Sequence, residues 1–282
     1  MKIIRTSTVT KAVSRLCIEA NINLRKDVLA ALKSACRRET NPRAKNFIRD
    51  IIKNASIAKR NNIAICQDTG LPVVFLEIGQ GIQFTGVDLN KAVQKGIEAG
   101  YKKAGLRNSI VTDPVCRKGK QVFSPGIIHT DLVSGSRLKI TVLPKGFGCE
   151  NKSRLKMFNP TVDIAEIKEF IVAAVRDAGP DACPPYIVGV GIGGTADYAC
   201  LLAKKALLKK VTSYELPVTS YESKLEKDLL KEINKLNIGP MGLGGKITAL
   251  AVNIETQPTH IAGLPVAVNI SCHALRSAAA LL

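Results

Sequence analysis

The chain has 282 residues, of which 46% are hydrophobic and 23% are charged, as in an ordinary folded protein. These proportions argue against disorder, and the length suffices for one large domain or two modest ones. No apolar run reaches the roughly 18 residues of a membrane span, and charges interrupt the N-terminal segment where a signal peptide would be apolar. A cytoplasmic location is therefore expected.

The net charge is +18, which would suit nucleic acid, an anionic membrane, an acidic partner chain or an anionic substrate. Aromatic residues make up only 4% and Trp is absent, so stacking surfaces for single-stranded nucleic acid are scarce. The lysines at 102–105 and 203–210 are spread along predicted helices, as on a solvated helix face. We expect neither nucleic acid nor a membrane as a partner.

The first sixty residues are predicted to be helical, because apolar residues recur at helical spacing. Expected helices cover 8–20 and 24–36, and a third begins at Pro42. Asn41 is well placed as the cap of this third helix, which Asn61 and Asn62 end.

From about residue 63 the pattern changes to alternating strands and helices. Short segments rich in Val and Ile predict strands at 72–78, 138–143, 186–190, 248–254 and 265–270. Helical spacing and capping residues predict helices at 88–103, 163–177, 195–210 and 221–236. The expected fold class is mixed α/β in one domain, 1–282, with a helical N-terminal part, 1–62, and an α/β part, 63–282.

Eight cysteines in a long chain without an export signal are more often thiols or metal ligands than disulfides. Their spacing matches neither a zinc ribbon nor a ferredoxin, so spacing alone gives little support for a metal site. The stronger signal is the setting of individual cysteines in turn-rich segments beside predicted strands.

The first such segment, CQDTGLP, places a thiol, an amide, a carboxylate and a hydroxyl in succession from Cys66 onward. Loops of this kind beside a rigid strand often carry functional sites. The alternative is a structural turn, in which Asp68 bonds to backbone amides and Cys66 is a small buried hydrophobe.

The second segment, GPDACPP, surrounds Cys183 with prolines. Just beyond it, Gly189, Gly191 and Gly194 match the G-x-G-x-x-G pattern of dinucleotide-binding proteins, with Glu215 at a suitable distance. Glu215 lies in VTSYELPVTS, which lacks the buried apolar strand that should deliver a ribose-binding carboxylate. Nucleotide binding is therefore the weaker interpretation.

The third segment, GPMGLGGK at 239–246, would suit an anion nest of successive amides as well as a plain turn. The fourth holds His260 at its start and the pair Cys272 and His273 at its end. Two histidines flanking a strand that ends in cysteine leave structural and functional roles open.

Five stretches together resemble the alpha-type catalytic domain of the iron–sulfur hydro-lyases, namely class I fumarate hydratases and L-tartrate dehydratases. They are CQDTGLPVVFLEIG, LPKGFGCENKS, GPDACPPYIVGVGIGGTAD, GPMGLGGKITALAV and HIAGLPVAVNISCHALR, in family order and over nearly the full chain. The resemblance implies a [4Fe–4S] cluster held by Cys66, Cys183 and Cys272. Three thiolates leave one iron open as a Lewis acid for the departing hydroxide.

The same resemblance implies roles for further residues. Gln67, Asp68, Arg107 and the backbone near Gly148 would bind the substrate. The planar fork of Arg107 suits a carboxylate, and a surface salt bridge is its alternative role. Asp68 with His260 would form the acid pair that protonates the leaving hydroxyl.

One position departs from the family pattern, because Cys149 stands where Ser is common. Its thiol would lie near the implied cluster region. We group it with the other cysteines that are expected to be packing or incidental thiols, Cys17, Cys36, Cys116 and Cys200.

The family also needs a beta-type swivelling domain, which is expected on a separate beta subunit. The resemblance thus implies the alpha subunit of a fumarate hydratase, in an alpha2beta2-type heteromer that interconverts fumarate and (S)-malate. An L-tartrate dehydratase, which forms oxaloacetate from tartrate, shares these motifs and stays open. A cluster-bearing binding protein without its own chemistry is the further alternative.

Overall fold

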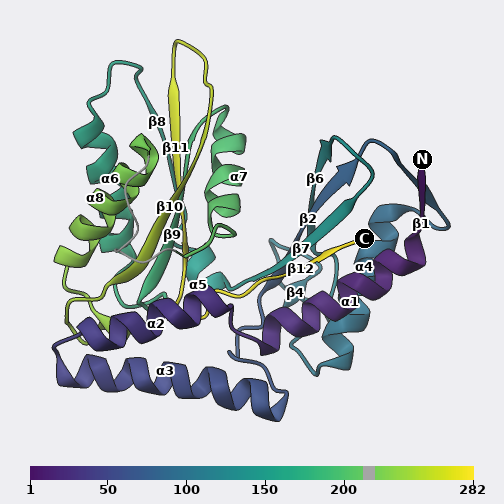
Figure 1. The fold of residues 1–282 in the computed structure, drawn as a ribbon, viewed down its shortest axis with the longest axis horizontal. Helices are drawn as coiled ribbons and strands as arrows, with labels where there is room; N and C mark the ends of the chain where they lie inside the picture. The colour runs from purple at the N-terminus through teal and green to yellow at the C-terminus, as the bar shows by residue number, and fades with distance from the viewer. Residues whose placement is uncertain (212–219) are drawn as a thin grey trace. The chain divides into compact units, whose positions relative to one another are not determined.

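A computed structural model describes residues 1–211 and 220–282, and Figure 1 shows its helices and strands. The chain is mixed α/β, as predicted. It divides into two compact units. The first contains Met1–Arg25, Ala55–Phe147 and Arg276–Leu282, and the second contains Lys26–Asn54 and Gly148–Leu275.

The first unit is built on a four-stranded sheet in the order β12-β7-β2-β6. Its strands are β2 (Leu71–Gly79), β6 (Ile127–Val133), β7 (Leu138–Lys145) and β12 (Ala278–Leu281). β2 lies parallel to β6 and antiparallel to β7, and β12 lies antiparallel to β7. The apolar runs that predicted β2 and β7 are explained by their central places in the sheet, where both are largely buried.

Two helices cover this sheet and supply the core of the first unit. α1 (Thr6–Ile22) packs against α4 (Leu89–Lys103) and against β7. The core consists mainly of aliphatic side chains, among them Val9, Val13, Leu16, Val93, Ile97, Val74, Leu76, Ile140 and Val142. Asp88 caps α4 by accepting a hydrogen bond from the backbone of Lys91, which is why the helix begins where the sequence predicts.

Four short strands complete the first unit. β1 (Lys2–Arg5) pairs in parallel with β3 (Ile82–Thr85), and β4 (Ile110–Val111) pairs with β5 (Gln121–Val122). The N-terminal part is largely helical, as predicted, and β1 is a short strand that the sequence did not predict. Only Ile4 of this strand is buried, and its partner lies far along the chain, so local periodicity carries no signal for it.

The second unit is built on another four-stranded sheet, in the order β10-β9-β11-β8. Its strands are β8 (Arg154–Phe158), β9 (Tyr186–Gly193), β10 (Ala249–Gln257) and β11 (Leu264–Ser271). β9 and β10 are parallel, whereas β11 is antiparallel to both β9 and β8. In Figure 1, α6 (Ile164–Ala178) and α8 (Tyr221–Lys235) lie on one face of this sheet and α7 (Ala196–Ala206) lies on the other.

The sequence of β9 alternates in a way that explains these two faces. Successive strand residues point to opposite sides of a sheet. Val188 and Val190 pack into the cluster formed with α6 and α8. On the other face, a Cβ added to Gly189 or Gly191 would overlap backbone carbonyl oxygens of α7. The two glycines therefore let α7 lie close against the strand.

The helices α2 (Lys26–Arg38), α3 (Pro42–Asn61) and α5 (Phe147–Glu150) and a single turn at Pro240–Gly242 complete the described fold. The side chain of Asn41 accepts hydrogen bonds from the backbone of Arg43 and Ala44, so the predicted cap of α3 is confirmed.

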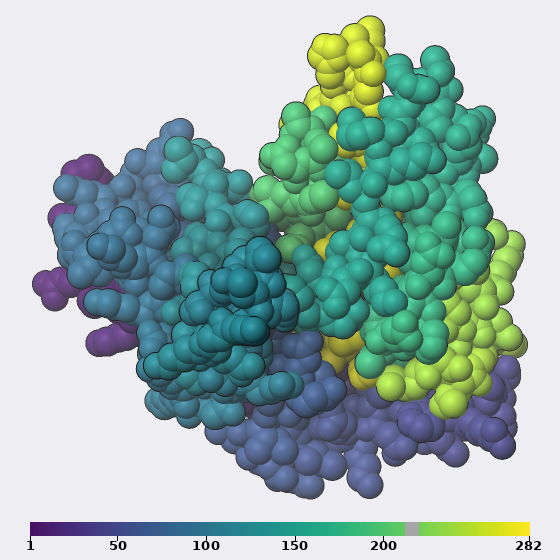
Figure 2. Space-filling view, turned by 180° about the vertical axis from the view of Figure 1, so that it is seen from behind, coloured from purple at the N-terminus to yellow at the C-terminus, as the bar shows by residue number. Residues whose placement is uncertain are grey.

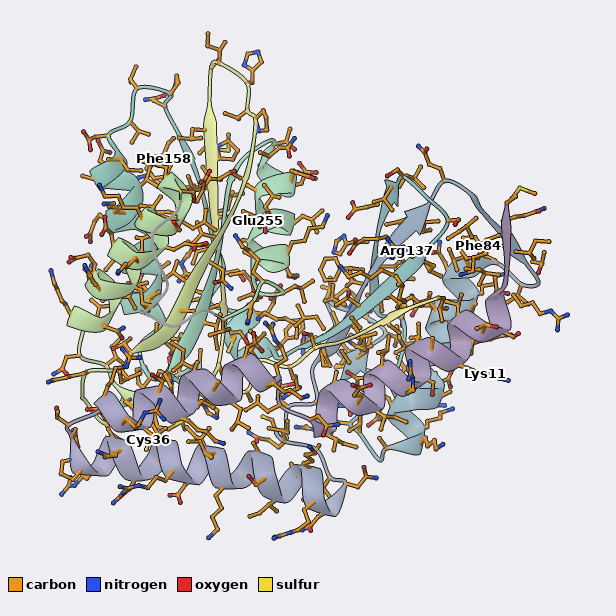
Figure 3. All side chains as sticks on the ribbon, viewed as in Figure 1. Lys11, Cys36, Phe84, Arg137, Phe158 and Glu255 are labelled. Atoms are coloured by element: carbon orange, nitrogen blue, oxygen red, sulfur yellow. The ribbon has the colours of Figure 1, made fainter. Side chains whose placement is uncertain are left out.

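Phe158, labelled in Figure 3, packs edge to face against Phe170 of α6, with ring centroids 5.7 Å apart.

One predicted helix was too long. α7 ends at Ala206, and the next residues form turns in which Leu208 donates to Lys205. Glu215 lies outside the described residues. No helix among the described residues is both long and apolar enough to cross a membrane.

Candidate functional site

The loop 66–70, which we call the CQDTG loop, belongs to the first unit and leads directly into β2. Side chains from elsewhere in that unit bind its carbonyl oxygens. Arg107 donates from Nη1 to the carbonyl of Gln67 at 3.4 Å, and Arg276 donates from Nη2 to the carbonyl of Asp68.

Tyr101 of α4 binds the next two carbonyls of the loop. Its hydroxyl donates to the oxygen of Thr69 at 2.9 Å and to that of Gly70 at 3.1 Å. Burial raises the pKa of Tyr101 well above its ordinary value, so the phenol keeps its proton and stays a donor. Four successive carbonyls of the CQDTG loop are thus held by three side chains.

The carboxylate of Asp68 is bound by backbone amides. Its Oδ1 accepts from the N–H of Gly70 at 3.0 Å, and its Oδ2 accepts from the N–H of Phe147 at 2.8 Å. This is the structural role that the sequence left open for Asp68. These two hydrogen bonds do not use the full accepting capacity of the carboxylate, because each oxygen has lone pairs for a further donor.

Two other predicted residues, Cys66 and Gln67, belong to the same loop, and Arg107 lies against it. The half-buried thiol of Cys66 lies 3.5 Å from Oε1 of the exposed Gln67. Arg107 is exposed, and its backbone N–H donates to the hydroxyl of Thr69 at 3.2 Å. Its guanidinium therefore binds a backbone carbonyl of the loop, whereas the sequence left open a surface salt bridge.

The other two predicted cysteine ligands belong to the second unit, where His273 connects their turns. His273 follows Cys272 directly, and its Nδ1 lies 3.0 Å from the carbonyl oxygen of Cys183. Because a carbonyl only accepts, Nδ1 carries the proton in this contact. Cys183 has a φ of +58°, which is unusual for a residue with a side chain, so its turn is tightly specified.

Cys149 is buried, and its thiol donates to the carbonyl of Ala182 at 3.3 Å. This contact ties α5 to the turn that carries Cys183. The backbone N–H of Met241 donates to Pro184 at 2.9 Å, so the glycine-rich segment also packs on that turn. Sequence segments far apart in the chain therefore meet around Cys183.

The glycine-rich segment 239–246 does not present a row of open amides. Gly239 donates to the hydroxyl of Thr248 and Gly245 donates to the side chain of Asn237. The backbone N–H of Ile247 donates to the buried carboxylate of Glu39 at 3.1 Å. The amide that binds an anion here is thus the one directly after the segment, and its anion is a side chain of the same protein.

His260 lies on the exposed loop between β10 and β11, which Figure 2 shows in yellow at the surface. Its Nδ1 accepts a hydrogen bond from the backbone of Ala262 at 3.1 Å. The whole of β11 separates His260 from Cys272, and eight extended residues span about 26 Å. The structure therefore places the two residues at opposite ends of one strand.

Gly148 lies exposed in α5. A Cβ added there would meet no atom of the described residues within 4 Å. A ligand could therefore approach this backbone without displacing a side chain of the chain.

Gly189 and Gly191 lie inside β9, whereas a dinucleotide fingerprint places its glycines at the turn between strand and helix. Their lack of side chains is explained by the close approach of α7. This packing role favours the structural interpretation of these glycines over nucleotide binding, which the sequence already gave as the weaker interpretation.

No group of three or more His, Cys, Asp and Glu side chains is gathered as a metal site in the part of the chain that the structure describes. The chemistry of the candidate donors fits an iron–sulfur cluster. Cys66, Cys183 and Cys272 are thiols, each is half-buried, and each lies outside regular strands and helices. Thiolates that are accessible in this way are the usual ligands of such clusters.

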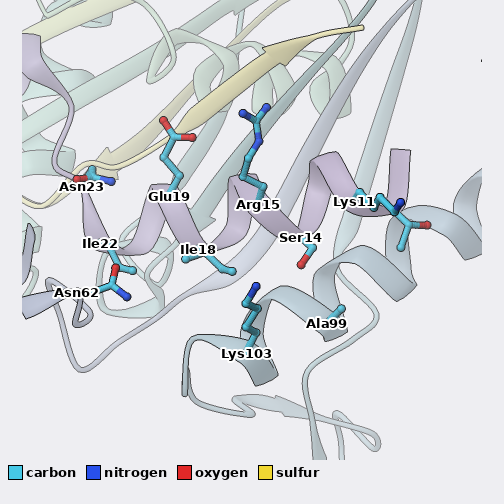
Figure 4. Close-up of a pocket in the computed structure, with 11 residues that line it drawn as sticks. Lys11, Ser14, Arg15, Ile18, Glu19, Ile22, Asn23, Asn62, Ala99 and Lys103 are labelled. Carbon is cyan, nitrogen blue, oxygen red and sulfur yellow. The ribbon is translucent and has the colours of Figure 1, made fainter. Parts of the chain in front are cut away.

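A cavity of about 490 Å³ lies in the first unit and is lined mainly by α1 and α4 (Figure 4). Lys11, Arg15 and Lys103 contribute basic groups to it. None of the predicted site residues lines this cavity.

Sequence reasoning missed Tyr101 and Arg276 as residues of the candidate site. Tyr101 has the spacing of an ordinary core residue of α4, which conceals its contact with the loop. Arg276 carried a usable signal, because it is the only charged residue in the apolar stretch ALRSAAALL.

Comparison with known proteins matches residues 10–280 to the family described as fumarate hydratase (Fumerase). A protein of Methanocaldococcus jannaschii named "Putative L(+)-tartrate dehydratase subunit alpha" is 41% identical, over 96% of this chain and 96% of the relative. L(+)-tartrate dehydratase subunit alpha of Escherichia coli strain UTI89 is 30% identical, over 95% of this chain and 88% of the relative. The Shigella sonnei protein of the same name is 29% identical over the same shares.

The chain therefore belongs to the fumarate hydratase (Fumerase) family. The enzymes of this family are hydro-lyases.

Proposed function

We propose that this chain is the alpha subunit of a [4Fe–4S]-dependent fumarate hydratase that acts together with a separate beta subunit. The observation that carries the proposal is the setting of Cys66, Cys183 and Cys272, three half-buried thiols on turns next to strands, in a chain that matches the family almost end to end. The name "subunit alpha" of the relatives supports a partner subunit.

Cys66, Cys183 and Cys272 would be the cluster ligands. When bound, the cluster would supply a Lewis-acidic iron for the hydroxyl and carboxylate of a small dicarboxylic acid. The half-burial of the three thiols suits this role, because a ligand exposed to bulk water would be oxidised more readily.

Gln67, Arg107 and the backbone at Gly148 would bind the substrate. Gln67 and Arg107 are exposed beside the CQDTG loop, and Gly148 has open space at its Cα. Arg107 can pair with one carboxylate of the substrate through guanidinium nitrogens other than Nη1, which binds the loop.

Asp68 and His260 would be the acid pair that protonates the leaving hydroxyl. The two amides that bind Asp68 fix the direction of its carboxylate. His260 is about 26 Å from Cys272 along β11, so in this role it would act at the site of a second copy of the chain. The proposed assembly with two alpha subunits provides such a copy.

A second candidate is an L(+)-tartrate dehydratase alpha subunit, which the names of the relatives favour. Both activities remove or add water at a 2-hydroxy dicarboxylate, so the same residues of this chain would serve either. Fumarate is our first choice because of the family match.

Anaerobic reconstitution with iron and sulfide tests the proposal. The wild-type alpha chain should bind about four irons, and Cys66→Ser, Cys183→Ser and Cys272→Ser should each lose much of the iron and sulfide. Cys149→Ser is the matched control and should keep the wild-type count, because the Cys149 thiol already bonds to Ala182. Retention of a full cluster by all three ligand variants would overturn the assignment.

Turnover is measured with and without the beta subunit of the same source. The reconstituted alpha chain alone should be inactive, and the mixture should hydrate fumarate to malate. Faster conversion of tartrate than of fumarate would favour the second candidate. Turnover by the alpha chain alone would contradict the need for a partner.

A further inference from the structure

Arg276 is buried in the first unit although it carries a charge. Only 3% of its surface is exposed, and its Nε has no hydrogen-bond partner among the residues that the structure describes. Burying a guanidinium costs free energy unless its donors are satisfied, and an unpartnered buried N–H adds to that cost. An apolar side chain of similar size would suit the fold better, so the contact that Arg276 does make calls for an explanation.

That contact is with the CQDTG loop. Arg276 donates to the carbonyl of Asp68, between the carbonyl that Arg107 binds and the two that Tyr101 binds. Tyr101 is also buried, with 1% of its surface exposed. Two buried polar side chains are therefore directed at three neighbouring carbonyls of one short loop.

Fixing these carbonyls fixes the side chains between them. A peptide group is planar, so the direction of each C=O sets the orientation of the whole peptide plane. Two successive planes define the Cα–Cβ direction of the residue that joins them. The planes after Gln67, Asp68 and Thr69 are all held, which fixes the Cα–Cβ direction of Asp68, and the amides of Gly70 and Phe147 then hold its carboxylate.

We propose that Arg276 and Tyr101 are positioning residues that hold the CQDTG loop, and through it Cys66 and Asp68, in the arrangement that the reaction uses. The catalytic consequence rests on the proposed function above, whereas the hold on the loop does not. Arg276 lies four residues after Cys272 in the sequence.

The hold on the loop is tested in the protein without metal, by the rate at which iodoacetamide alkylates Cys66. Arg276→Gln and Tyr101→Phe should each raise this rate about tenfold, because each removes buried hydrogen bonds that keep the loop closed. Arg15→Gln, which removes an exposed arginine of α1, should leave the rate unchanged. Mass spectrometry of the peptide that contains Cys66 gives the rate for that thiol alone.

Cys17 separates loosening of the loop from unfolding of the unit. It has no exposed surface, and burial raises its pKa to about 12, so its thiol reacts only when the unit opens. If Arg276→Gln exposes Cys17, the alkylation rate of Cys66 in Tyr101→Phe decides the test, because this variant keeps the ring and loses only the hydroxyl. If both variants keep Cys17 protected, an unchanged alkylation rate of Cys66 in both overturns the proposal. If Arg276→Gln exposes Cys17, an unchanged rate in Tyr101→Phe alone overturns it.

The catalytic consequence is tested in the reconstituted enzyme with its beta subunit. Tyr101→Phe should lower kcat about tenfold and change KM less than about threefold, because a misdirected Asp68 slows the chemical step more than it weakens binding. Arg276→Lys should recover part of the activity that Arg276→Gln loses, since it keeps the charge without the planar fork. If the wild-type enzyme is inactive, the proposed function fails while the alkylation result still decides the hold on the loop.

Discussion

The buried carboxylate of Glu39 accepts a hydrogen bond from the backbone N–H of Ile247, 208 residues further along the chain, at 3.1 Å. Its other oxygen accepts from the N–H groups of Thr40 and Asn41 at 2.8 and 2.9 Å. Glu39 follows α2 and Ile247 precedes β10. One side chain thus ties the helical segment of the second unit to the start of β10, an edge strand of its sheet.

Replacement of Glu39 by Gln should destabilise the protein markedly. The amide group of Gln would turn a donor toward backbone donors that now meet a carboxylate oxygen, so at least one buried N–H would lose its partner. We expect the free energy of unfolding to fall by about 1–3 kcal/mol. Urea denaturation measures the change, with Glu98→Gln as control. Glu98 forms an exposed ion pair with Lys102, and its loss should cost less than about 1 kcal/mol.

Gly245 should not tolerate a side chain while Glu39 is present. It has a φ of +116°, and an added Cβ would lie 2.8 Å from both carboxylate oxygens of Glu39. Gly245→Ala should therefore lower the free energy of unfolding by about 1–3 kcal/mol. Glu39→Ala removes the carboxylate that an added Cβ at position 245 would meet. The two substitutions together should therefore lower the free energy of unfolding by less than the sum of their separate effects. Strict additivity in this double-mutant cycle would show that the carboxylate does not limit Gly245.

Gly191→Ala should be among the most damaging single substitutions in the second unit. The new methyl group would overlap the backbone carbonyl of Ala199, so α7 would have to move away from β9. We expect a loss of about 3 kcal/mol or more, or insoluble protein. Gly148→Ala is the matched control, because its Cβ would meet no atom within 4 Å, and its stability should stay within about 0.5 kcal/mol of the wild type.

The same packing explanation predicts that NAD does not bind at these glycines. Addition of NAD should leave the melting temperature of the wild-type protein unchanged. A rise in melting temperature that grows with NAD concentration would contradict the packing explanation.

Tyr186 should make the protein less stable at alkaline pH. Burial raises the pKa of its phenol above the ordinary value of 10.0, so the folded state holds the proton more tightly than the unfolded state. Stability is then unaffected below pH 10 and falls as the pH rises above it, by about 1.4 kcal/mol per pH unit for one such group. Tyr186→Phe should show a shallower decline than the wild type between pH 10 and 11. Tyr221→Phe, which alters a tyrosine that is 66% exposed, should follow the wild type.

The central strands and the helices that cover them could be predicted from the sequence, because burial on both sides makes them apolar. β9 and β11 are examples, because Val or Ile recurs along both strands and nearly every position is buried. β8 could not be predicted, because it is an edge strand whose first four residues, RLKM, are exposed and carry two charges. Its place depends on pairing with β11, which local pattern does not encode.

The turns that carry the candidate site residues were predictable from the sequence, whereas the contacts between them were less so. The segments around Cys66 and Cys183 do form turns beside β2 and β9, as their Pro and Gly content indicates. The sequence places His260 and Cys272 in one motif. The extended strand β11 lies between them, however, so the two residues are far apart in space although they are close in sequence. The contact between Arg276 and Asp68 joins residues 208 apart, and no local signal reports it.

The held carbonyls of the CQDTG loop also bear on repair after oxidative damage. Arg107, Arg276 and Tyr101 bind the loop through hydrogen bonds that the protein makes by itself. If the proposed cluster is lost to oxygen, we expect it to be rebuilt on a loop that these hydrogen bonds still hold. The rate of recovery would be set by the delivery of iron and sulfide rather than by refolding of the protein.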